Sequence, residues 1–166
     1  MTFVYRKGRT TPLVKKVVAN SQALQVGEAV RIDNDGFIVT CPTGSTVYGV
    51  VAGIVGKNGE TLRTNGAGGD FDPLGSYTFA SDNETVDQVS VLIQTSKLAQ
   101  YSVSMDATPG TTTGSNLAGY RMDHLSGGLV LDESTAATTA AQWVSLGLDP
   151  EDATHVLVQI FEHQTD

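Results

Sequence analysis

The chain has 166 residues, of which 40% are hydrophobic, which is enough for one sizeable domain with a packed core or for two small ones. Glycine is abundant with 18 residues, whereas Lys and Arg together number only 10, and this balance predicts a mostly β protein with little helix. The formal net charge of −8 argues against nucleic-acid binding, and no stretch approaches the length of apolar sequence that crosses a membrane.

The N-terminal segment differs from the rest of the chain in charge. Half of the ten basic residues lie in residues 1–16, and no acidic residue occurs before Glu28. A basic segment on an acidic body suits docking to an acidic protein surface, so residues 1–16 are predicted to form a docking arm. A solvated terminus with incidental charge is the alternative. No apolar run follows the basic residues, so no export signal is expected.

Residues 17–64 are predicted to form a small, barrel-like β module. Strands at 26–32 and 37–40 flank Asp33-Asn34-Asp35-Gly36, in which Asp35-Gly36 supplies the positive φ of a hairpin turn. Gly49 and Gly53 lie within the apolar segment 46–55, which indicates a bent or bulged strand pressed against another backbone. Asn58-Gly59 predicts a second hairpin turn into residues 61–63.

The second half is predicted to be a β-sandwich or barrel over residues 77–166. A Gly-rich linker or loop at 65–76 separates it from the first module. Short apolar segments separated by turn residues give the candidate strands, at 77–80, 88–94, 99–104, 117–122, 129–131, 142–144 and 156–161. Residues 134–141 have some helical character, but three Thr residues weaken it.

The last of these strands is predicted to be central in its sheet. It follows the turn of residues 147–152, in which Asp149 can accept hydrogen bonds from free backbone donors. The strand is apolar with little alternation, which is typical of a strand covered on both faces. Val156, Val158 and Ile160 form a wholly aliphatic face that should meet the core, whereas Gln159 interrupts the other face, which is the candidate assembly edge.

The sequence predicts no catalytic, cofactor-binding or metal site. It lacks the glycine spacing of a dinucleotide fingerprint or a phosphate loop and the elbow of a serine hydrolase. Cys41 is alone, so it forms no disulfide within the chain, and it has no neighbouring histidine, so it is expected to be a buried apolar residue. His155 and His163 are too far apart along an extended strand to share one metal ion.

Two further patterns, a cluster of acids and a glycosylation match, are interpreted as structural rather than functional. The acids at 149–152 could collect a calcium ion, but turn capping is the preferred interpretation. Asn83-Glu84-Thr85 matches a glycosylation acceptor, and without secretion the match is expected to be chance.

Two segments carry a resemblance to a known family. Residues 13–30 and then Tyr48-Gly49-Val50-Val51-Ala52-Gly53-Ile54-Val55 resemble the small β module of the capsid decoration, or cement, proteins of tailed bacteriophages. Residues 147–154 and the strand after them resemble C-terminal ends of phage virion structural proteins. Together these segments cover about half the chain.

The resemblance implies a structural virion protein rather than an enzyme. Proteins of this family bind the outside of the phage head, often as trimers, and stabilise the shell. The expected partners are therefore the major capsid protein and further copies of this chain in a homotrimer. The resemblance also implies that the chain is made in the host cytoplasm and is located on the outer capsid surface. Aromatic and arginine side chains are favoured anchors in interfaces. The expected capsid contacts are Phe3, Tyr5, Arg6, Lys7, Arg9, Lys15 and Lys16.

Two other functions stay open at this stage. One is another virion β domain, such as a head-fibre base or a tail-associated module that binds glycans through Trp143, although Trp143 lies in an expected strand and is expected to be a core residue. The other is a small hydrolase whose carboxylates converge only in the folded chain.

Overall fold

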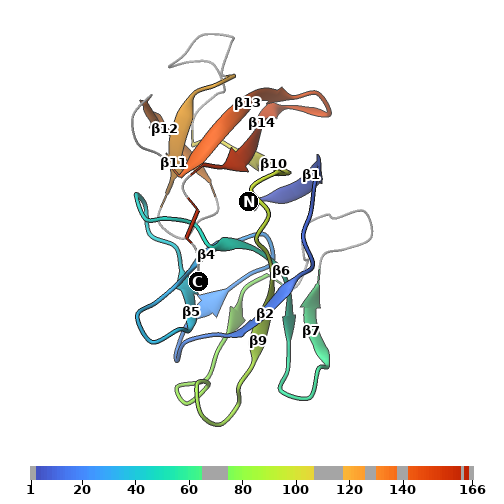
Figure 1. Cartoon of the computed structure of the whole chain (residues 1–166), viewed down its shortest axis with the longest axis vertical. Helices are drawn as coiled ribbons and strands as arrows, with labels where there is room; N and C mark the ends of the chain where they lie inside the picture. Colours follow the sequence, from blue (N-terminus) through green and yellow to red (C-terminus); the bar gives the residue numbers. More distant parts are fainter. Residues whose placement is uncertain are drawn as a thin grey trace.

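The computed structural model describes residues 3–64, 75–106, 118–125, 130–137, 142–161 and 163–164, and within these ranges it contains strands and no helix. The mostly β prediction is confirmed. The strands form two six-stranded sheets and one two-stranded ribbon. Figure 1 shows the two large sheets at opposite ends of the long axis of the molecule. The sequence suggests some helix at 134–141, and this is wrong for residues 134–137, which belong to a strand. Residues 138–141 lie outside the described ranges.

The first sheet, called sheet A here, lies at the upper end in Figure 1 and has the strand order β1-β10-β14-β13-β11-β12. Its strands are β1 (Val4–Gly8), β10 (Ala99–Ser104), β11 (Arg121–His124), β12 (Leu131–Ala137), β13 (Trp143–Asp149) and β14 (Asp152–Ile160). The closing strand β14 pairs with β10 on one side and β13 on the other, so the prediction that it is central is confirmed.

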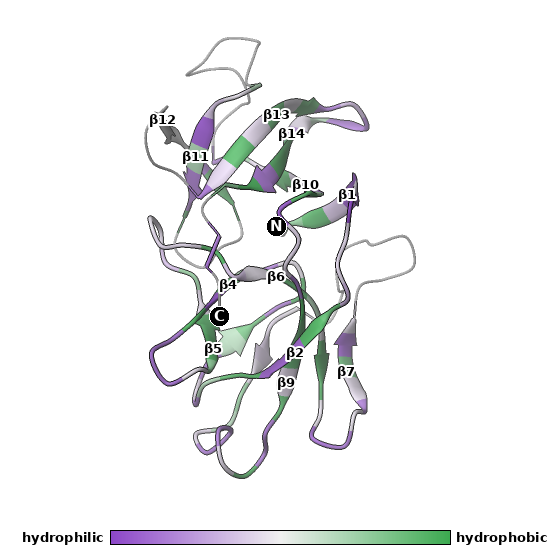
Figure 2. Cartoon of the chain, viewed as in Figure 1, coloured by the Kyte–Doolittle hydropathy of each residue, from purple (hydrophilic) through white to green (hydrophobic). Residues whose placement is uncertain are grey.

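The second sheet, sheet B, has the order β2-β9-β6-β4-β5, with β7 also paired to β6. Its strands are β2 (Val14–Val17), β4 (Ala29–Ile32), β5 (Ile38–Thr40), β6 (Gly49–Val55), β7 (Thr61–Thr64) and β9 (Ser90–Gln94), while β3 (Ala23–Leu24) and β8 (Tyr77–Thr78) form the ribbon. Figure 2 shows hydrophobic residues along the strands and hydrophilic residues in the turns at the lower end of the molecule.

The predicted hairpin turns form for local reasons. Asp33 accepts hydrogen bonds at Oδ1 from the backbone N–H groups of Asp35 and Phe37, and Gly36 adopts a φ of +89°, so β4 and β5 pair across this turn. Gly49 is also needed, because a Cβ there would lie 2.6 Å from the carbonyl oxygen of Gln94 on β9. This close approach confirms the predicted contact with another backbone.

The pairing of strands crosses the boundaries expected from the sequence. β1 lies within the expected arm of residues 1–16 but is an edge strand of sheet A, and β8 and β9 lie within residues 77–166 but pair with strands of the first half. The N-terminal segment therefore joins the two sheets: its first strand completes sheet A and its second completes sheet B. Most of the Gly-rich loop predicted at 65–76 lies outside the described residues.

The two sheets pack against each other through a shared core. The core around Trp143 contains residues of sheet A together with Ala29, Cys41, Val47 and Val50 from the strands and loops of sheet B. A second core fills sheet B and the ribbon, with Ile54 and Phe79 among its buried side chains. The aliphatic face of β14, made of Val156, Val158 and Ile160, is buried in the first core, as predicted.

Asn83 lies in the loop before β9 and is fully buried. Its Nδ2 donates hydrogen bonds to the carbonyl oxygens of Val18, at 2.6 Å, and Val89, at 3.0 Å, and its Oδ1 accepts from the N–H of Val89. The amide of the glycosylation match is therefore used in the interior, which supports the interpretation that the match is chance.

Glu28, just before β4, is only 4% exposed. Its carboxylate accepts hydrogen bonds from the N–H of Gln25 and the hydroxyl of Thr40, but burial outweighs both and raises its pKa from 4.5 to about 7. The folded chain therefore binds more protons here than the unfolded chain between about pH 4.5 and 7, so this group lowers the free energy of unfolding as pH rises through that window.

Glu28→Gln is expected to remove this dependence, because an amide mimics the protonated acid. The variant should match the native chain near pH 4.5 and exceed its unfolding free energy at pH 8 by up to about 3 kcal/mol, since each pKa unit corresponds to about 1.4 kcal/mol. Urea denaturation at a series of pH values measures the difference. The exposed Glu60→Gln is the control, and an equal pH dependence in Glu28→Gln and native chain would contradict the assignment.

Candidate functional site

The N-terminal segment is a folded part of the structure. Phe3 is buried, with 2% of its surface exposed, and its ring stacks on Trp143 with the centroids 4.2 Å apart. Its N–H also donates to the carbonyl of Gly27, at 2.8 Å, which ties the segment to the sheet B side of the molecule. Phe3 is therefore an interior anchor in this arrangement, not the exposed capsid contact that the sequence predicts.

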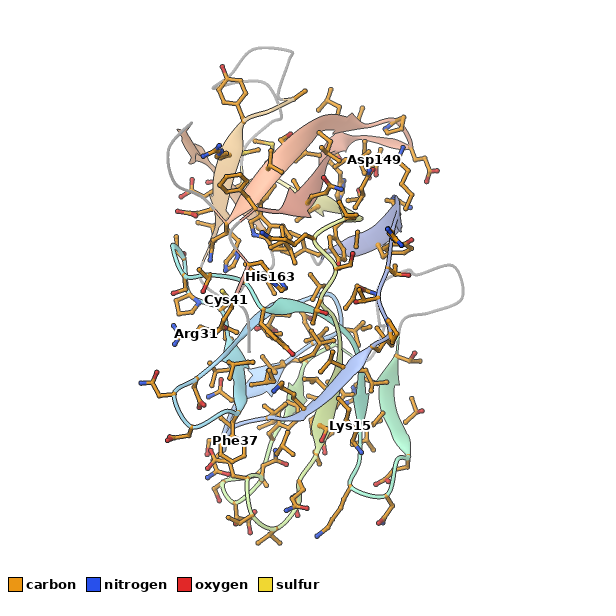
Figure 3. All side chains as sticks on the ribbon, in the orientation of Figure 1. Lys15, Arg31, Phe37, Cys41, Asp149 and His163 are labelled. Carbon is orange, nitrogen blue, oxygen red and sulfur yellow. The ribbon has the colours of Figure 1, made fainter. Side chains whose placement is uncertain are left out.

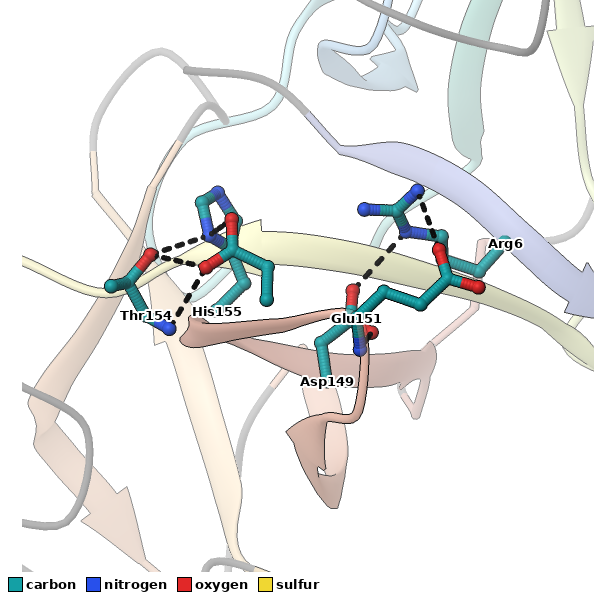
Figure 4. A network of polar contacts seen from close by, with 6 residues as sticks. Arg6, Asp149, Glu151, Thr154 and His155 are labelled. Atoms are coloured by element: carbon teal, nitrogen blue, oxygen red, sulfur yellow. Dashed lines mark hydrogen bonds and ion pairs between the residues drawn. The ribbon is translucent and has the colours of Figure 1, made fainter.

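Arg6 is held by two carboxylates in the turn between β13 and β14. Its Nε lies 3.1 Å from Asp149 Oδ2 and its Nη1 lies 3.2 Å from Glu151 Oε2, as Figure 4 shows. Burial acts to raise the pKa of Asp149, but the hydrogen bonds to its carboxylate and the charge of Arg6 outweigh it, so the pKa lies below its ordinary value. Arg6 thus fixes β1 on the sheet rather than presenting a free charge.

The remaining predicted contacts divide by exposure. Lys16 is half-buried and its Nζ lies 5.7 Å from the centroid of the Tyr48 ring. Tyr5, Lys7, Arg9 and Lys15 are exposed, and Figure 3 shows Lys15 on β2. Because β1 and β2 are edge strands of sheets A and B, the structure places exposed basic side chains along an edge of each sheet. Lysines at such positions also prevent unwanted pairing of sheet edges.

A cavity of about 170 Å³ lies beside this segment, and no pattern in the sequence predicts it. Its walls come from both sheets: Val50, Val51 and Ala52 of β6 form one side, and Tyr101 of β10 forms part of the other. The N-terminal segment contributes Phe3, Tyr5, Thr10 and Leu13, and β9 contributes Gln94. Tyr5 and Leu13 are 37% and 46% exposed, so the cavity reaches the surface beside them.

A buried polar network joins the two sheets near Cys41, which Figure 3 shows between them. The indole Nε1 of Trp143 donates to Nδ1 of His124 at 2.9 Å, so the other ring nitrogen carries the proton and donates to the carbonyl of Cys41 at 2.8 Å. Gln142 Nε2 donates to the carbonyl oxygens of Pro42, at 2.9 Å, and Ser45. These bonds fasten the loop between β5 and β6 to strands β11 and β13.

The chemistry of this network is structural. Burial lowers the pKa of His124, against an opposing contribution from its bond to the Cys41 carbonyl, so the imidazole stays neutral. Burial likewise raises the pKa of the Cys41 thiol to about 12, which keeps it protonated and a poor nucleophile at neutral pH. The prediction that Cys41 is a buried apolar residue is confirmed.

The remaining residues that the sequence offers as metal ligands, in and beside the turn between β13 and β14, bond to one another and to the backbone. His155 Nδ1 lies 2.8 Å from Asp152 Oδ2, and the N–H and hydroxyl of Thr154 donate to Asp152 Oδ1, so this acid caps its own turn. Figure 4 shows Thr154 and His155 side by side. Asp149 accepts from the N–H of Glu151, as the turn-capping interpretation predicts. Within the described ranges, no group of three or more His, Cys, Asp or Glu side chains could hold a metal ion.

Trp143 is fully buried, which confirms that it is a core residue and removes it as a surface glycan contact. The part of the chain that the structure describes holds no helix long and apolar enough to span a membrane. Comparisons of the chain with protein families, with curated proteins and with solved structures find no match.

Proposed function

We propose that the chain is a structural virion protein that binds the outer surface of a phage capsid, as a homotrimer on the major capsid protein, and stabilises the shell. The observation that carries the proposal is the placement of Lys7, Arg9 and Lys15. These side chains are exposed on an otherwise acidic protein: Lys7 lies on the edge strand β1, Lys15 lies on the edge strand β2, and Arg9 lies in the connection between them. They form a basic docking surface suited to an acidic partner.

The way in which this docking surface is held also supports the proposal. Phe3 fixes one end of the segment in the core, Arg6 is clamped between two carboxylates, and the Ser96 hydroxyl donates to the carbonyl of Arg9. A surface that is already ordered loses little conformational entropy on binding. The outer edges of β1 and β2 can additionally pair with a strand of the partner, which is a common way to add main-chain hydrogen bonds to an interface.

Co-sedimentation of the purified chain with expanded phage heads tests the proposal. Lys7→Glu, Arg9→Glu and Lys15→Glu are each expected to weaken binding by about three- to tenfold at low salt, and less at high salt, because exposed interface charges act mainly through screened attraction. Lys57→Glu, in the exposed turn between β6 and β7, is the matched control and should bind normally.

Point substitutions are the suitable test because deleting residues 2–12 would remove β1 and the Phe3 anchor together. Such a deletion would unfold part of sheet A whether or not the segment touches a capsid. Absence of the native chain from sedimented heads, or unchanged occupancy in all three charge variants, would overturn the proposal.

A further inference from the structure

The cavity beside the N-terminal segment is open to solvent and exposes apolar side chains. Tyr5 and Leu13, at its opening, are 37% and 46% exposed, although both side chains are large and mostly apolar. Residues 50–52 of β6 contribute only aliphatic side chains to the wall. Exposed apolar side chains that gather around a depression are typical of a surface that another molecule covers.

No charged side chain lines the cavity, but basic side chains flank it. Leu13 immediately precedes β2 and Lys15 lies within it, so these two side chains project from the same side of the extended chain. Arg9 directly precedes Thr10, which lines the cavity. Both cations are exposed, and no acidic residue occurs before Glu28, whose own side chain is buried. The N-terminal segment therefore gives the cavity a positive rim on a protein whose net charge is −8.

Two polar side chains of the wall are already paired, so the cavity favours an apolar side chain. Gln94 Oε1 accepts from the N–H and the hydroxyl of Thr11, and its Nε2 donates to the carbonyl of Thr11. The Tyr5 hydroxyl donates to the carbonyl of Gly8, at 3.0 Å. A polar side chain entering the cavity would give up its hydrogen bonds to water and find Gln94 and Tyr5 engaged. The same bonds hold the N-terminal segment in place, so little conformational entropy is lost when a partner binds.

We propose that the cavity seats one apolar side chain of an acidic polypeptide segment, with the acids on either side of that side chain facing Arg9 and Lys15. The inference rests on the proposed function, because it names what the major capsid protein presents to the basic docking surface. Since the cavity adjoins that surface, a partner that binds there also reaches the cavity. An apolar anchor in a depression, surrounded by charges that stay partly solvated, is a common arrangement in protein interfaces.

Titration of the ¹⁵N-labelled chain with short synthetic peptides tests this chemistry by NMR. The probe is an acetylated and amidated pentapeptide with leucine between two pairs of aspartates, and the controls carry alanine in place of the leucine or lysines in place of the aspartates. The leucine probe should shift the amide signals of Leu13, Val51 and Ala52 saturably at millimolar concentration. It should bind about tenfold more tightly than the alanine peptide, because leucine removes more apolar surface from water. The lysine peptide should produce no saturable shifts.

Variants at the opening provide the second arm. Leu13→Asp places an acid beside the cavity and should abolish binding of the leucine probe, and Leu13→Ser, which adds no charge, should weaken it by about three- to tenfold. Val86→Asp, which changes an exposed apolar residue in the loop before β9, is the matched control and should bind the probe as the native chain does. The inference is overturned if the leucine probe gives no saturable shifts, if the leucine and alanine peptides bind equally, or if both Leu13 variants bind the probe normally.

Co-sedimentation with expanded heads separates this inference from the proposed function. Leu13→Ser should bind heads more weakly at low and at high salt, because salt does not screen the burial of apolar surface. Normal head binding by Leu13→Ser, beside weakened binding by Lys15→Glu, would overturn the role of the cavity and leave the proposed function standing. Absence of the native chain from sedimented heads would overturn both. Analytical ultracentrifugation tests the other occupant: dissociation of a native oligomer by Leu13→Ser would place a second copy of the chain in the cavity and overturn the inference.

Discussion

Replacing Trp143 with alanine is expected to lower the free energy of unfolding by about 3–5 kcal/mol, the cost of truncating a fully buried aromatic side chain. The indole packs the N-terminal segment onto sheet A, because it stacks on Phe3 and meets Tyr101 of β10 edge-on, with 6.2 Å between the centroids of the Tyr101 and Trp143 rings. Its loss would also leave Nδ1 of His124 buried without its donor. The N-terminal segment should therefore loosen together with the core.

The measurement is urea denaturation followed by far-UV circular dichroism, since Trp143 is the single tryptophan and its removal abolishes the native fluorescence signal. Trp143→Phe separates the two contributions: it keeps a stacking ring, loses the donor to His124, and should cost about 1–3 kcal/mol. Leu148→Ala on the same strand, where the side chain is 41% exposed, is the control. A Trp143→Ala variant no less stable than this control would contradict the packing described above.

The second large effect is expected at Asn83. Asn83→Ala would leave two backbone groups unpaired, the carbonyl oxygen of Val18 and the N–H of Val89, at a cost of about 1–3 kcal/mol for each, while the Val89 carbonyl keeps the N–H of Val18 as a donor. A total loss of about 2–4 kcal/mol follows. Asn83→Asp should be at least as harmful, because an acceptor oxygen would then face two carbonyl oxygens.

Thermal and urea unfolding of both variants measure these losses, and Asn34→Ala in the exposed hairpin turn is the matched control. Retention of native stability by Asn83→Ala would show that the Val18 carbonyl and the Val89 N–H find other partners. The same variant tests how β2 and β9 are held together, because Asn83 bonds both Val18, just after β2, and Val89, just before β9.

The features that could be predicted from sequence are those whose causes are local. The hairpin turn at Asp33 to Gly36 depends on a side chain and a glycine within four residues of each other, and the buried face of β14 depends on the alternation of Val156, Val158 and Ile160. The turn and the buried face each depend on only a few neighbouring residues. The core position of Trp143 followed in the same way from its place within an expected strand.

The features that sequence analysis missed depend on partners far away in the chain. Phe3 is buried because Trp143, 140 positions later, offers a ring to stack on, and nothing near Phe3 signals this contact. The cavity is lined by residues of both sheets and of the N-terminal segment, which come together only in the folded chain. Glu28 looks like any surface acid until its burial beneath the neighbouring strands is known. The exposed cations Lys7, Arg9 and Lys15 were identifiable by charge alone, whereas the clamp on Arg6 required Asp149.

The two edge strands at the start of the chain have a consequence for the order of folding during synthesis. Sheet B has all of its strands once the ribosome has released Gln94, but β2 must then close a loop of more than seventy residues to reach β9. Sheet A needs β14 between β10 and β13, so it is complete only when nearly the whole chain has been made. Such non-local closure raises the contact order and slows folding. The nascent chain should therefore be able to complete sheet B before sheet A, and Phe3 lacks the ring on which it stacks until Trp143 has been made.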